Sequence, residues 1–185
     1  MRTTLFFLSM SVLLTMGCTM SPRTVVLKPE IQPTTDSIGQ GRSVLLTVVD
    51  ERQSSSVDTY ANVTLQGNLV SIVKAAIADG LMSNGFVIAS NKPPDGRELR
   101  VEVRYLNYRA TSGLWAIGLQ TECSLKGICI IGSSRLYEQL YRGEHRWNVQ
   151  VAQSAEAIGK NLSIALSEAI NSLLRDYQMK QCLAK

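Results

Sequence analysis

Two stripes of apolar residues at helical spacing enclose a long region of strand-like alternation, and this order restricts the fold more than any other feature of the chain. The helical spacing runs over about 65–83 and over about 154–177. Between the stripes, residues 99–108 and 136–151 alternate apolar with charged residues, and a further β region covers about 114–131. The pattern predicts two helices and an antiparallel meander of three strands.

One earlier strand and a short return complete the predicted domain. Residues 43–50 form a near-continuous run of aliphatic and β-branched residues, which indicates a buried strand. Residues 86–88 follow the first helix after Asn84-Gly85, a typical helix end. We therefore expect a single α+β domain over residues 43–185, with a mixed sheet and two helices packed on one of its faces. The other face should contact solvent or a partner.

The first 17 residues have the layout of a removable signal peptide. One basic residue, Arg2, precedes an apolar run at residues 5–14, and the small residue Gly17 stands directly before Cys18. A run this short cannot span the roughly 30 Å hydrocarbon core of a bilayer as a helix. We expect cleavage after Gly17, which makes Cys18 the first residue of the mature chain.

A cysteine at this position resembles the lipobox of bacterial lipoproteins, where diacylglycerol is joined to the thiol and an acyl chain to the new amine. The usual box has Leu three places before the cysteine, and this chain has Thr15 there. An ordinary signal peptide that ends near a cysteine is the alternative. Several acyl chains would anchor the mature protein to a membrane without a spanning helix. Because Thr19 replaces the Asp that commonly retains lipoproteins at the inner membrane, we expect the outer membrane, with the domain facing the periplasm.

The stretch between the lipid and the domain is expected to be an extended tether. Residues 18–42 contain Pro22, Pro29 and Pro33 among small and polar residues, a composition typical of semi-extended linkers. The short apolar patch at residues 25–27 could add an edge strand. Past the leader, no stretch has the apolar length of a transmembrane helix.

The three cysteines after Cys18 are an odd number in an oxidising compartment, so at least one thiol stays free or pairs outside the chain. Cys123 and Cys129 can form a disulfide only across a turn, and Gly127 lies between them. Two buried, inert thiols are the alternative. No metal site or cofactor is expected, because Cys-x-x-Cys spacing is absent and His145 is the sole histidine.

The charge balance argues against nucleic acid as a partner. Removing the leader takes away one basic residue and leaves a formal charge of about +3. The basic residues are scattered among acidic ones, whereas a nucleic-acid-binding surface normally has a basic cluster.

Four arginines share the charged sides of the first and third meander strands. They are Arg100, Arg104, Arg142 and Arg146, with Glu102 and Glu144 interleaved. These side chains can form cross-strand ion pairs on a solvated face. They can also form a docking face for an anionic envelope component or an envelope protein, because the guanidinium fork matches carboxylate and phosphate geometry.

Few residues in the chain point to catalysis. His145 is the one group that titrates near neutral pH without a large shift, and it shares a strand face with Tyr141 and Trp147. Packing explains this placement better than acid–base chemistry. No nucleophile elbow, phosphate loop or zinc-binding helix motif occurs. We expect no enzymatic activity and assign no catalytic residue.

Several of these features together resemble the YajG family of Gram-negative lipoproteins. They are the leader with its cysteine, the strand ending in Val48-Val49-Asp50-Glu51-Arg52, the helix leading into Asn84-Gly85-Phe86, the meander and the final helix. The resemblance covers nearly the whole chain. It implies a lipid-anchored α+β domain of the cell envelope and does not imply an activity.

The leading hypothesis is a non-enzymatic interaction or assembly module of the envelope. One alternative is a lipid- or amphiphile-binding accessory of a transport system. It predicts a cavity between sheet and helices that is lined by Leu69, Ile77, Trp115, Leu166 and Leu173. The other is a subunit of a secretion or motility ring, which requires homotypic contacts through exposed strand edges.

Overall fold

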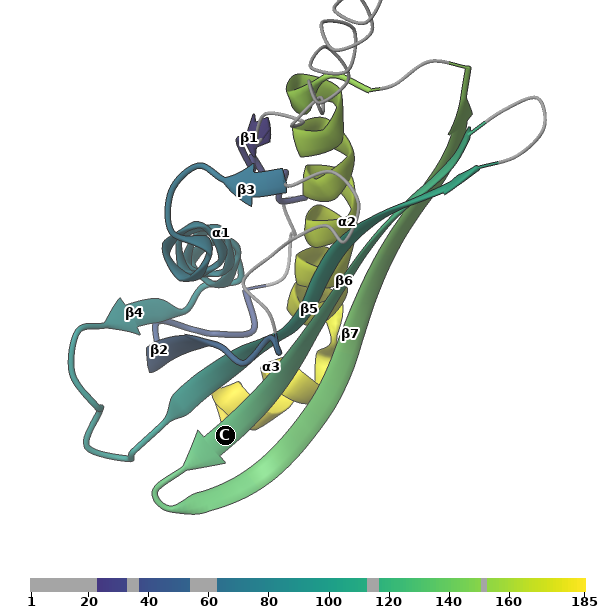
Figure 1. The fold of residues 1–185 in the computed structure, drawn as a ribbon. Coiled ribbons are helices and arrows are strands. Elements are labelled where there is room, and N and C mark those ends of the chain that lie inside the picture. The colour runs from purple at the N-terminus through teal and green to yellow at the C-terminus, as the bar shows by residue number, and fades with distance from the viewer. Residues whose placement is uncertain (1–22, 33–36, 54–62, 113–116, 151–152) are drawn as a thin grey trace, which may run out of the picture.

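A computed structural model describes residues 23–32, 37–53, 63–112, 117–150 and 153–185. Its main sheet has the strand order β4-β2-β5-β6-β7 (Figure 1). These strands are β2 (Ser43–Asp50), β4 (Val87–Ala89), β5 (Glu98–Ser112), β6 (Ile117–Ile131) and β7 (Ser134–Val149). β2 runs parallel to β4 and β5, whereas β5, β6 and β7 form an antiparallel meander. A separate small sheet pairs β1 (Arg23–Val25) with β3 (Val63–Leu65) in parallel.

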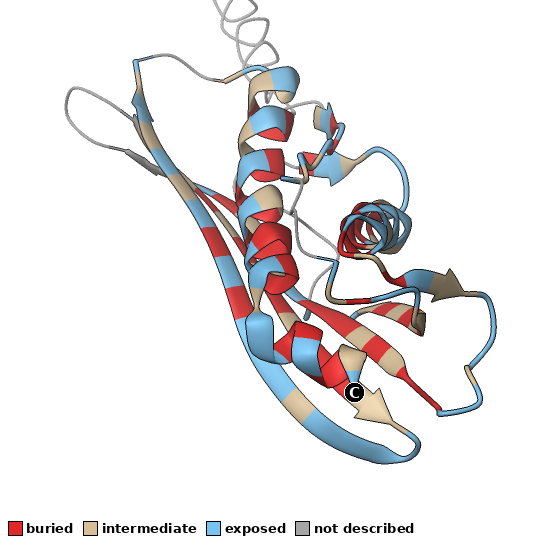
Figure 2. Cartoon of the chain, turned by 180° about the vertical axis from the view of Figure 1, so that it is seen from behind, coloured by how far each residue is buried: buried red, intermediate tan, exposed pale blue. Residues whose placement is uncertain are grey.

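The helices cover one face of the main sheet (Figure 2). They are α1 (Leu69–Ser83), α2 (Ala155–Arg175) and α3 (Tyr177–Ala184). Leu99, Val101 and Val103 of β5 point toward the helices and are completely buried. The alternate residues of the strands point to the opposite side, which we call the open face. The predicted α+β class, the mixed sheet, the meander and the helix-covered face are therefore confirmed.

Helix α2 is the longest helix of the described residues and packs along β6 and β7. Ser154 caps its N-terminus, where the hydroxyl accepts a hydrogen bond from the amide of Ala157 at 3.2 Å. Glu156 lies in the first turn, where a carboxylate favours the helix dipole. Gly143 of β7 lets the helix approach closely, since an added Cβ there would lie 2.0 Å from the carbonyl oxygen of Ala165.

The turn that a Cys123–Cys129 disulfide would require does not exist. β6 continues through both cysteines, with Cys123 opposite Gly143 and Cys129 opposite Tyr137 in the register with β7. Six strand steps of about 3.3 Å separate the two cysteines by about 20 Å, so they cannot be bridged. The Cys123–Cys129 disulfide, which the sequence left open beside two inert thiols, is therefore wrong.

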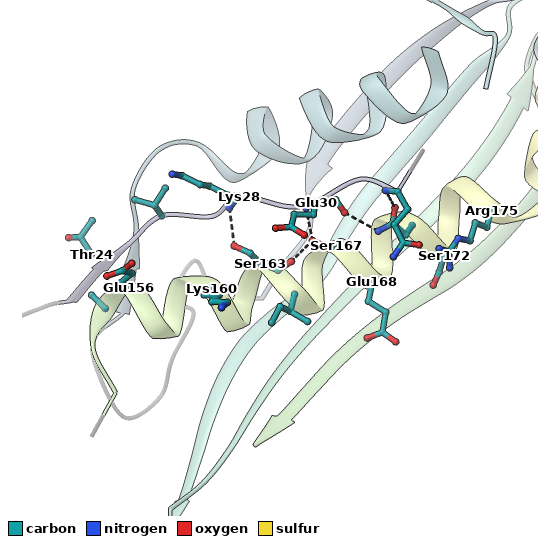
Figure 3. A pocket seen from close by; sticks show the side chains of 15 residues that line it. Thr24, Lys28, Glu30, Glu156, Lys160, Ser163, Ser167, Glu168, Ser172 and Arg175 are labelled. Carbon is teal, nitrogen blue, oxygen red and sulfur yellow. Dashed lines mark hydrogen bonds between the residues drawn. The ribbon is translucent and has the colours of Figure 1, made fainter. Parts of the chain in front are cut away.

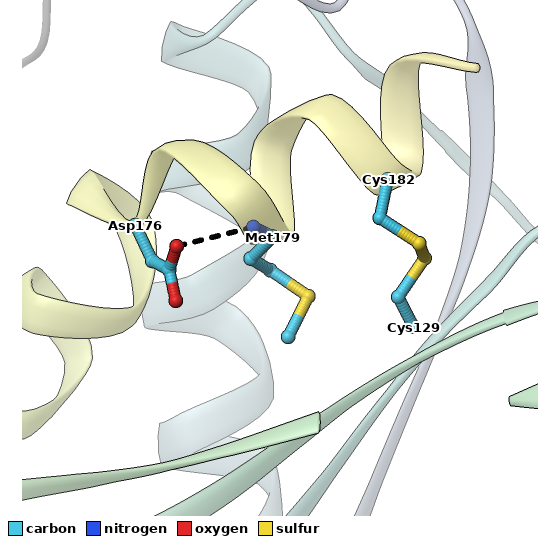
Figure 4. The surroundings of a disulfide bond; sticks show 4 residues. All are labelled: Cys129, Asp176, Met179 and Cys182. Carbon is cyan, nitrogen blue, oxygen red and sulfur yellow. Dashed lines mark hydrogen bonds between the residues drawn. A yellow bond between two sulfur atoms is a disulfide. The ribbon is translucent and has the colours of Figure 1, made fainter. Parts of the chain in front are cut away.

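The disulfide instead joins Cys129 to Cys182 of α3, with the two Cα atoms 6.4 Å apart (Figure 4). It fixes the C-terminal helix to β6, and sequence analysis did not predict this helix as a separate element. Cys123 remains a free thiol inside the core. Burial raises the pKa of the Cys123 thiol to about 12, against a smaller lowering effect of Arg52, so the thiol stays protonated and inert.

The folded domain begins earlier than predicted. Residues 23–32, assigned above to the tether, pack into the domain: Val25 and Leu27 are buried in the hydrophobic core, and β1 pairs with β3. The folded part therefore reaches at least to Arg23, instead of beginning at Ser43.

Reducing conditions should distinguish the two disulfide pairings. The bond closes a loop with a sequence separation of 53 residues. Its loss should lower the free energy of unfolding by about 2–4 kcal/mol. We expect reductant to lower the melting temperature of the wild type and of Cys123→Ala, but not that of the double variant Cys129→Ser/Cys182→Ser. A Cys123→Ala variant that no longer responds to reductant would contradict the Cys129–Cys182 pairing.

Candidate functional site: the N-terminal segment on helix α2

Residues 23–32, which we call the docked segment, lie between α1 and α2 and run along α2 (Figure 3). Three amides of the segment donate hydrogen bonds to α2 side chains. The amide of Lys28 donates to Oγ of Ser163 at 2.9 Å, and that of Glu30 to Oγ of Ser167 at 2.8 Å. The amide of Gln32 donates to Oδ1 of Asn171 at 2.9 Å, while Nδ2 of Asn171 donates to the carbonyl of Glu30 at 3.0 Å.

The regular spacing of these bonds has a simple geometric cause. Two residues of extended chain rise about 6.6 Å, and four residues of α-helix rise about 6.0 Å. Alternate amides of the docked segment therefore meet every fourth residue of α2. We call the four matching residues Gly159, Ser163, Ser167 and Asn171 the docking stripe.

The two ends of the contact are built differently. At Gly159 the chain backbones approach so closely that an added Cβ would lie 2.7 Å from the carbonyl oxygen of Val26. At the start of the segment, the Arg23 guanidinium donates to the carbonyl of Gln153 at 2.8 Å. Pro29 lacks an amide proton but stands at an alternate position, so it interrupts none of the three amide bonds and favours an extended chain.

An open groove of about 990 Å³ lies between the outward side chains of the docked segment and α2. Most of its lining residues are polar, and Val26, Ala155 and Ile164 are the apolar ones. The charged lining residues are of both signs: Lys28, Glu30, Glu156, Lys160, Glu168 and Arg175. This mixed lining favours no single charge class of ligand.

None of the four described residues that were predicted to line an internal cavity lines this groove. Leu69, Ile77, Leu166 and Leu173 are all buried in the hydrophobic core, and Trp115 lies outside the described residues. The space between the sheet and the helices is thus occupied by packed side chains at these four positions.

A cluster around Asp176 fixes the junction of α2 and α3. Its carboxylate accepts hydrogen bonds from the hydroxyls of Tyr137 and Tyr141 at 2.8 and 2.6 Å, and from the amides of Gln178 and Met179. Partial burial acts to raise the pKa of Asp176, but these hydrogen bonds lower it below its usual value. Burial and the hydrogen bond to Asp176 raise the pKa of Tyr141.

The predicted arginines all lie on β5 and β7 of the open face, with β6 between the two pairs. Three of them form ion pairs with neighbouring carboxylates. Arg100 lies 3.3 Å from Glu102 and 3.8 Å from Glu51, Arg104 pairs with Glu102, and Arg146 pairs with Glu144. Arg142 is exposed, and no ion pair of this side chain is found among the described residues. The open face therefore carries a largely self-neutralised network with Arg142 as a separate cation.

The strand-end motif and the histidine have structural roles. Arg52 donates two hydrogen bonds of 2.8 Å to the Asp50 carboxylate, and this pairing holds the pKa of Asp50 below its usual value. The ion pair joins the last residue of β2 to the chain that follows the strand. His145 is half-buried and stacks on Trp147 with ring centroids 5.1 Å apart, in agreement with its interpretation as a packing residue.

Two limits follow for the part of the chain that the structure describes. No three side chains of His, Cys, Asp or Glu gather there closely enough to hold a metal ion. No helix in that part is long and apolar enough to cross a bilayer.

The fold and motifs agree with a comparison with known families. Residues 29–184 match the model of the family Lipoprotein_16, described as uncharacterized lipoprotein. The chain therefore belongs to this family of Gram-negative lipoproteins, of YajG type, and the resemblance seen in the sequence is confirmed. No curated protein matches the sequence significantly.

Three solved structures share the fold, each at 10% sequence identity. A protein from Xanthomonas campestris has a TM-score of 0.58, with 87% of this chain and 96% of the other covered. A minor lipoprotein from Acinetobacter baumannii has a TM-score of 0.54, with 76% and 93% covered. A putative neuraminyllactose-binding hemagglutinin homolog from Helicobacter pylori has a TM-score of 0.51, with 85% and 97% covered. At this identity the likeness establishes the fold alone.

Removing the polar side chains of the docking stripe should release the docked segment. The triple variant Ser163→Ala/Ser167→Ala/Asn171→Ala loses the acceptors of three amides, each contributing about 1 kcal/mol. Hydrogen exchange at the amides of Lys28, Glu30 and Gln32 should then accelerate on the order of a hundredfold. Ser172→Ala, on the same helix and in the same groove, is the control and should leave their exchange unchanged. Equal exchange rates in the triple variant and the wild type would show that the segment is held without these bonds.

The Asp176 cluster should make stability depend on pH. Because the pKa of Asp176 is lowered by folding, its stabilising effect is complete above the unfolded pKa of about 3.9 and disappears as pH falls through the folded pKa. Asp176→Asn should therefore be less stable than the wild type by about 1–2 kcal/mol at pH 7, and the difference should shrink below about pH 4. Urea unfolding at pH 7 and below about pH 4 measures this difference in the free energy of unfolding. Asp79→Asn, at an exposed position of α1, is the control. A difference that persists unchanged at low pH would rule out ionised Asp176 as the cause.

Proposed function

We propose that this protein is a non-enzymatic lipoprotein of the outer membrane, anchored through acylated Cys18 and facing the periplasm as an interaction module. The observation that carries the proposal is the position of Cys18, directly after a segment with the layout of a signal peptide and only five residues before Arg23. Membership of the lipoprotein family supports the anchor. Thr19 supports the outer membrane as the destination.

The docked segment limits the length of free chain between the anchor and the domain. Five residue steps separate Cys18 from Arg23, and a fully extended chain covers at most about 3.6 Å per step, or about 18 Å. A free tether reaching to Ser43 would instead extend up to about 90 Å. The domain is thus held close to the bilayer, with β1 and the N-terminus of α2 nearest the anchor.

The interaction surface proposed for this module is the open face of the sheet. In the part of the chain that the structure describes, the helices occupy the other face, so the open face is the large sheet surface left for a partner. Arg100, Arg104 and Arg146 are already paired with carboxylates, and Arg142 supplies an exposed guanidinium for an anionic group. An anionic envelope component or an acidic patch of an envelope protein has the complementary charge.

Mass spectrometry of the protein from fractionated envelopes of its own host tests the proposal. The expected result is a mature chain that begins at Cys18, carries diacylglycerol and an N-acyl chain, and is found in the outer-membrane fraction. Cys18→Ser should remain unprocessed or lose the lipid, which serves as the control. An unmodified Cys18 in a chain recovered from the soluble fraction would contradict the anchor.

A further inference from the structure

β7 is the last strand of the main sheet, so one side of its backbone has no neighbouring strand among the described residues. It is also long, with 16 residues. An exposed edge of this length pairs readily with another strand unless side chains or a helix protect it. The protection of β7 is uneven along its length.

Helix α2 protects the edge around Gly143 and Glu144. The close approach of α2 occurs at Gly143, and Oε2 of Glu168 accepts a hydrogen bond of 2.8 Å from the amide of Glu144. This amide therefore points away from β6. Backbone groups alternate in direction along an antiparallel strand, and the register with β6 is regular from Tyr137 to Val149. The amides and carbonyls of Glu138, Leu140 and Arg142 consequently also point outward.

The side chains of the unprotected stretch suit a partner strand. Leu140 lies on the open face and is 40% exposed, which is unusual for a large apolar side chain on a strand edge. Glu138 is half exposed, and it pairs with Lys126 at 3.0 Å. Arg142 is exposed and lies two residues after Leu140, whereas Glu138 lies two residues before it. The two side chains carry opposite charges.

We infer that β7 pairs with β7 of a second copy of this chain, antiparallel and centred on Leu140. In this register Leu140 meets Leu140 of the second copy. Glu138 of each copy lies opposite Arg142 of the other, which gives two symmetry-related ion pairs. Opposite-charge and apolar cross-strand pairs are the contacts that stabilise a sheet. The result is one continuous sheet through both copies, formed by an isologous contact.

Neighbouring registers are less favourable. If one β7 strand is shifted along the other by an odd number of residues from this register, open-face side chains lie opposite side chains that face the helices. Centring the pairing on Glu138 places its carboxylate opposite Glu138 of the second copy. Centring on Gln139 places Glu138 opposite Leu140, which leaves the charge unmatched. Leu140 is the centre that matches both the apolar and the charged positions.

The symmetry of this pairing is compatible with a common membrane anchor. A twofold axis perpendicular to the sheet keeps both helical layers, and therefore both docked segments, on one side. This point rests on the proposed function, whereas the dimer itself does not. If both anchors lie in one bilayer, each copy has a higher effective concentration near the other. This would favour dimerisation even through a small interface. The open faces of the two copies would join into one surface.

Exchange of the two charges tests the register. Glu138→Arg and Arg142→Glu each replace both ion pairs with like-charge contacts, so each variant should dimerise about tenfold more weakly than the wild type. An equimolar mixture of the two variants restores opposite charges at both contacts, so the mixture should form heterodimers. Native mass spectrometry of the full-length chains in detergent counts the copies and distinguishes the two variants by mass.

Arg135→Glu is the matched control, since it makes the same charge change on β7 outside the paired stretch and should dimerise like the wild type. Circular dichroism establishes that each variant is folded. A wild type that remains monomeric at the highest concentration, with no heterodimer in the mixture, would overturn the inference. A dimer that is equally strong in both single variants would place the interface elsewhere and would also overturn it.

Discussion

The hydrogen bonds between an extended chain and a helix organise this protein. Alternate amides of residues 23–32 donate to every fourth side chain of α2, because two extended residues and four helical residues have nearly the same rise. This match gives the amides of Lys28, Glu30 and Gln32 acceptors on polar side chains of α2. It also brings Val25 and Leu27 into the core. The segment that joins the domain to its expected anchor is therefore part of the folded domain.

Helix α2 connects the docked segment with the sheet. The apolar stripe beside the docking stripe packs on β6 and β7, and Gly143 allows the helix to lie close to the strand. At the C-terminal end of the helix, Asp176 and the Cys129–Cys182 disulfide attach α3 to the same two strands. The helical layer is thus fixed at both ends, and the open face remains available. This division separates the side of the expected anchor from the side proposed to meet partners.

The sequence predicted those features that depend on periodicity. Alternation along β5 and β7 and the apolar stripes of α1 and α2 define which side of each element is buried, so the α+β class and the open-face position of Arg100 and Arg142 could be anticipated. The docked segment could not, because its bonds use backbone amides that leave no periodic apolar signal. The repeat of Gly159, Ser163, Ser167 and Asn171 beside the apolar stripe was the available sign. The disulfide was missed because its pairing depends on a short C-terminal helix and on the strand that replaces the expected turn.

The most direct test of this account is the height of the domain above the membrane. Energy transfer from a fluorophore at Ser154, beside the start of the docked segment, to acceptor lipids in vesicles reports this height for the acylated protein. The account predicts strong transfer, because a folded chain from Arg23 onward leaves at most about 18 Å of connection to Cys18. Weak transfer, equal to that of a chain with an unstructured linker in place of residues 23–32, would contradict it.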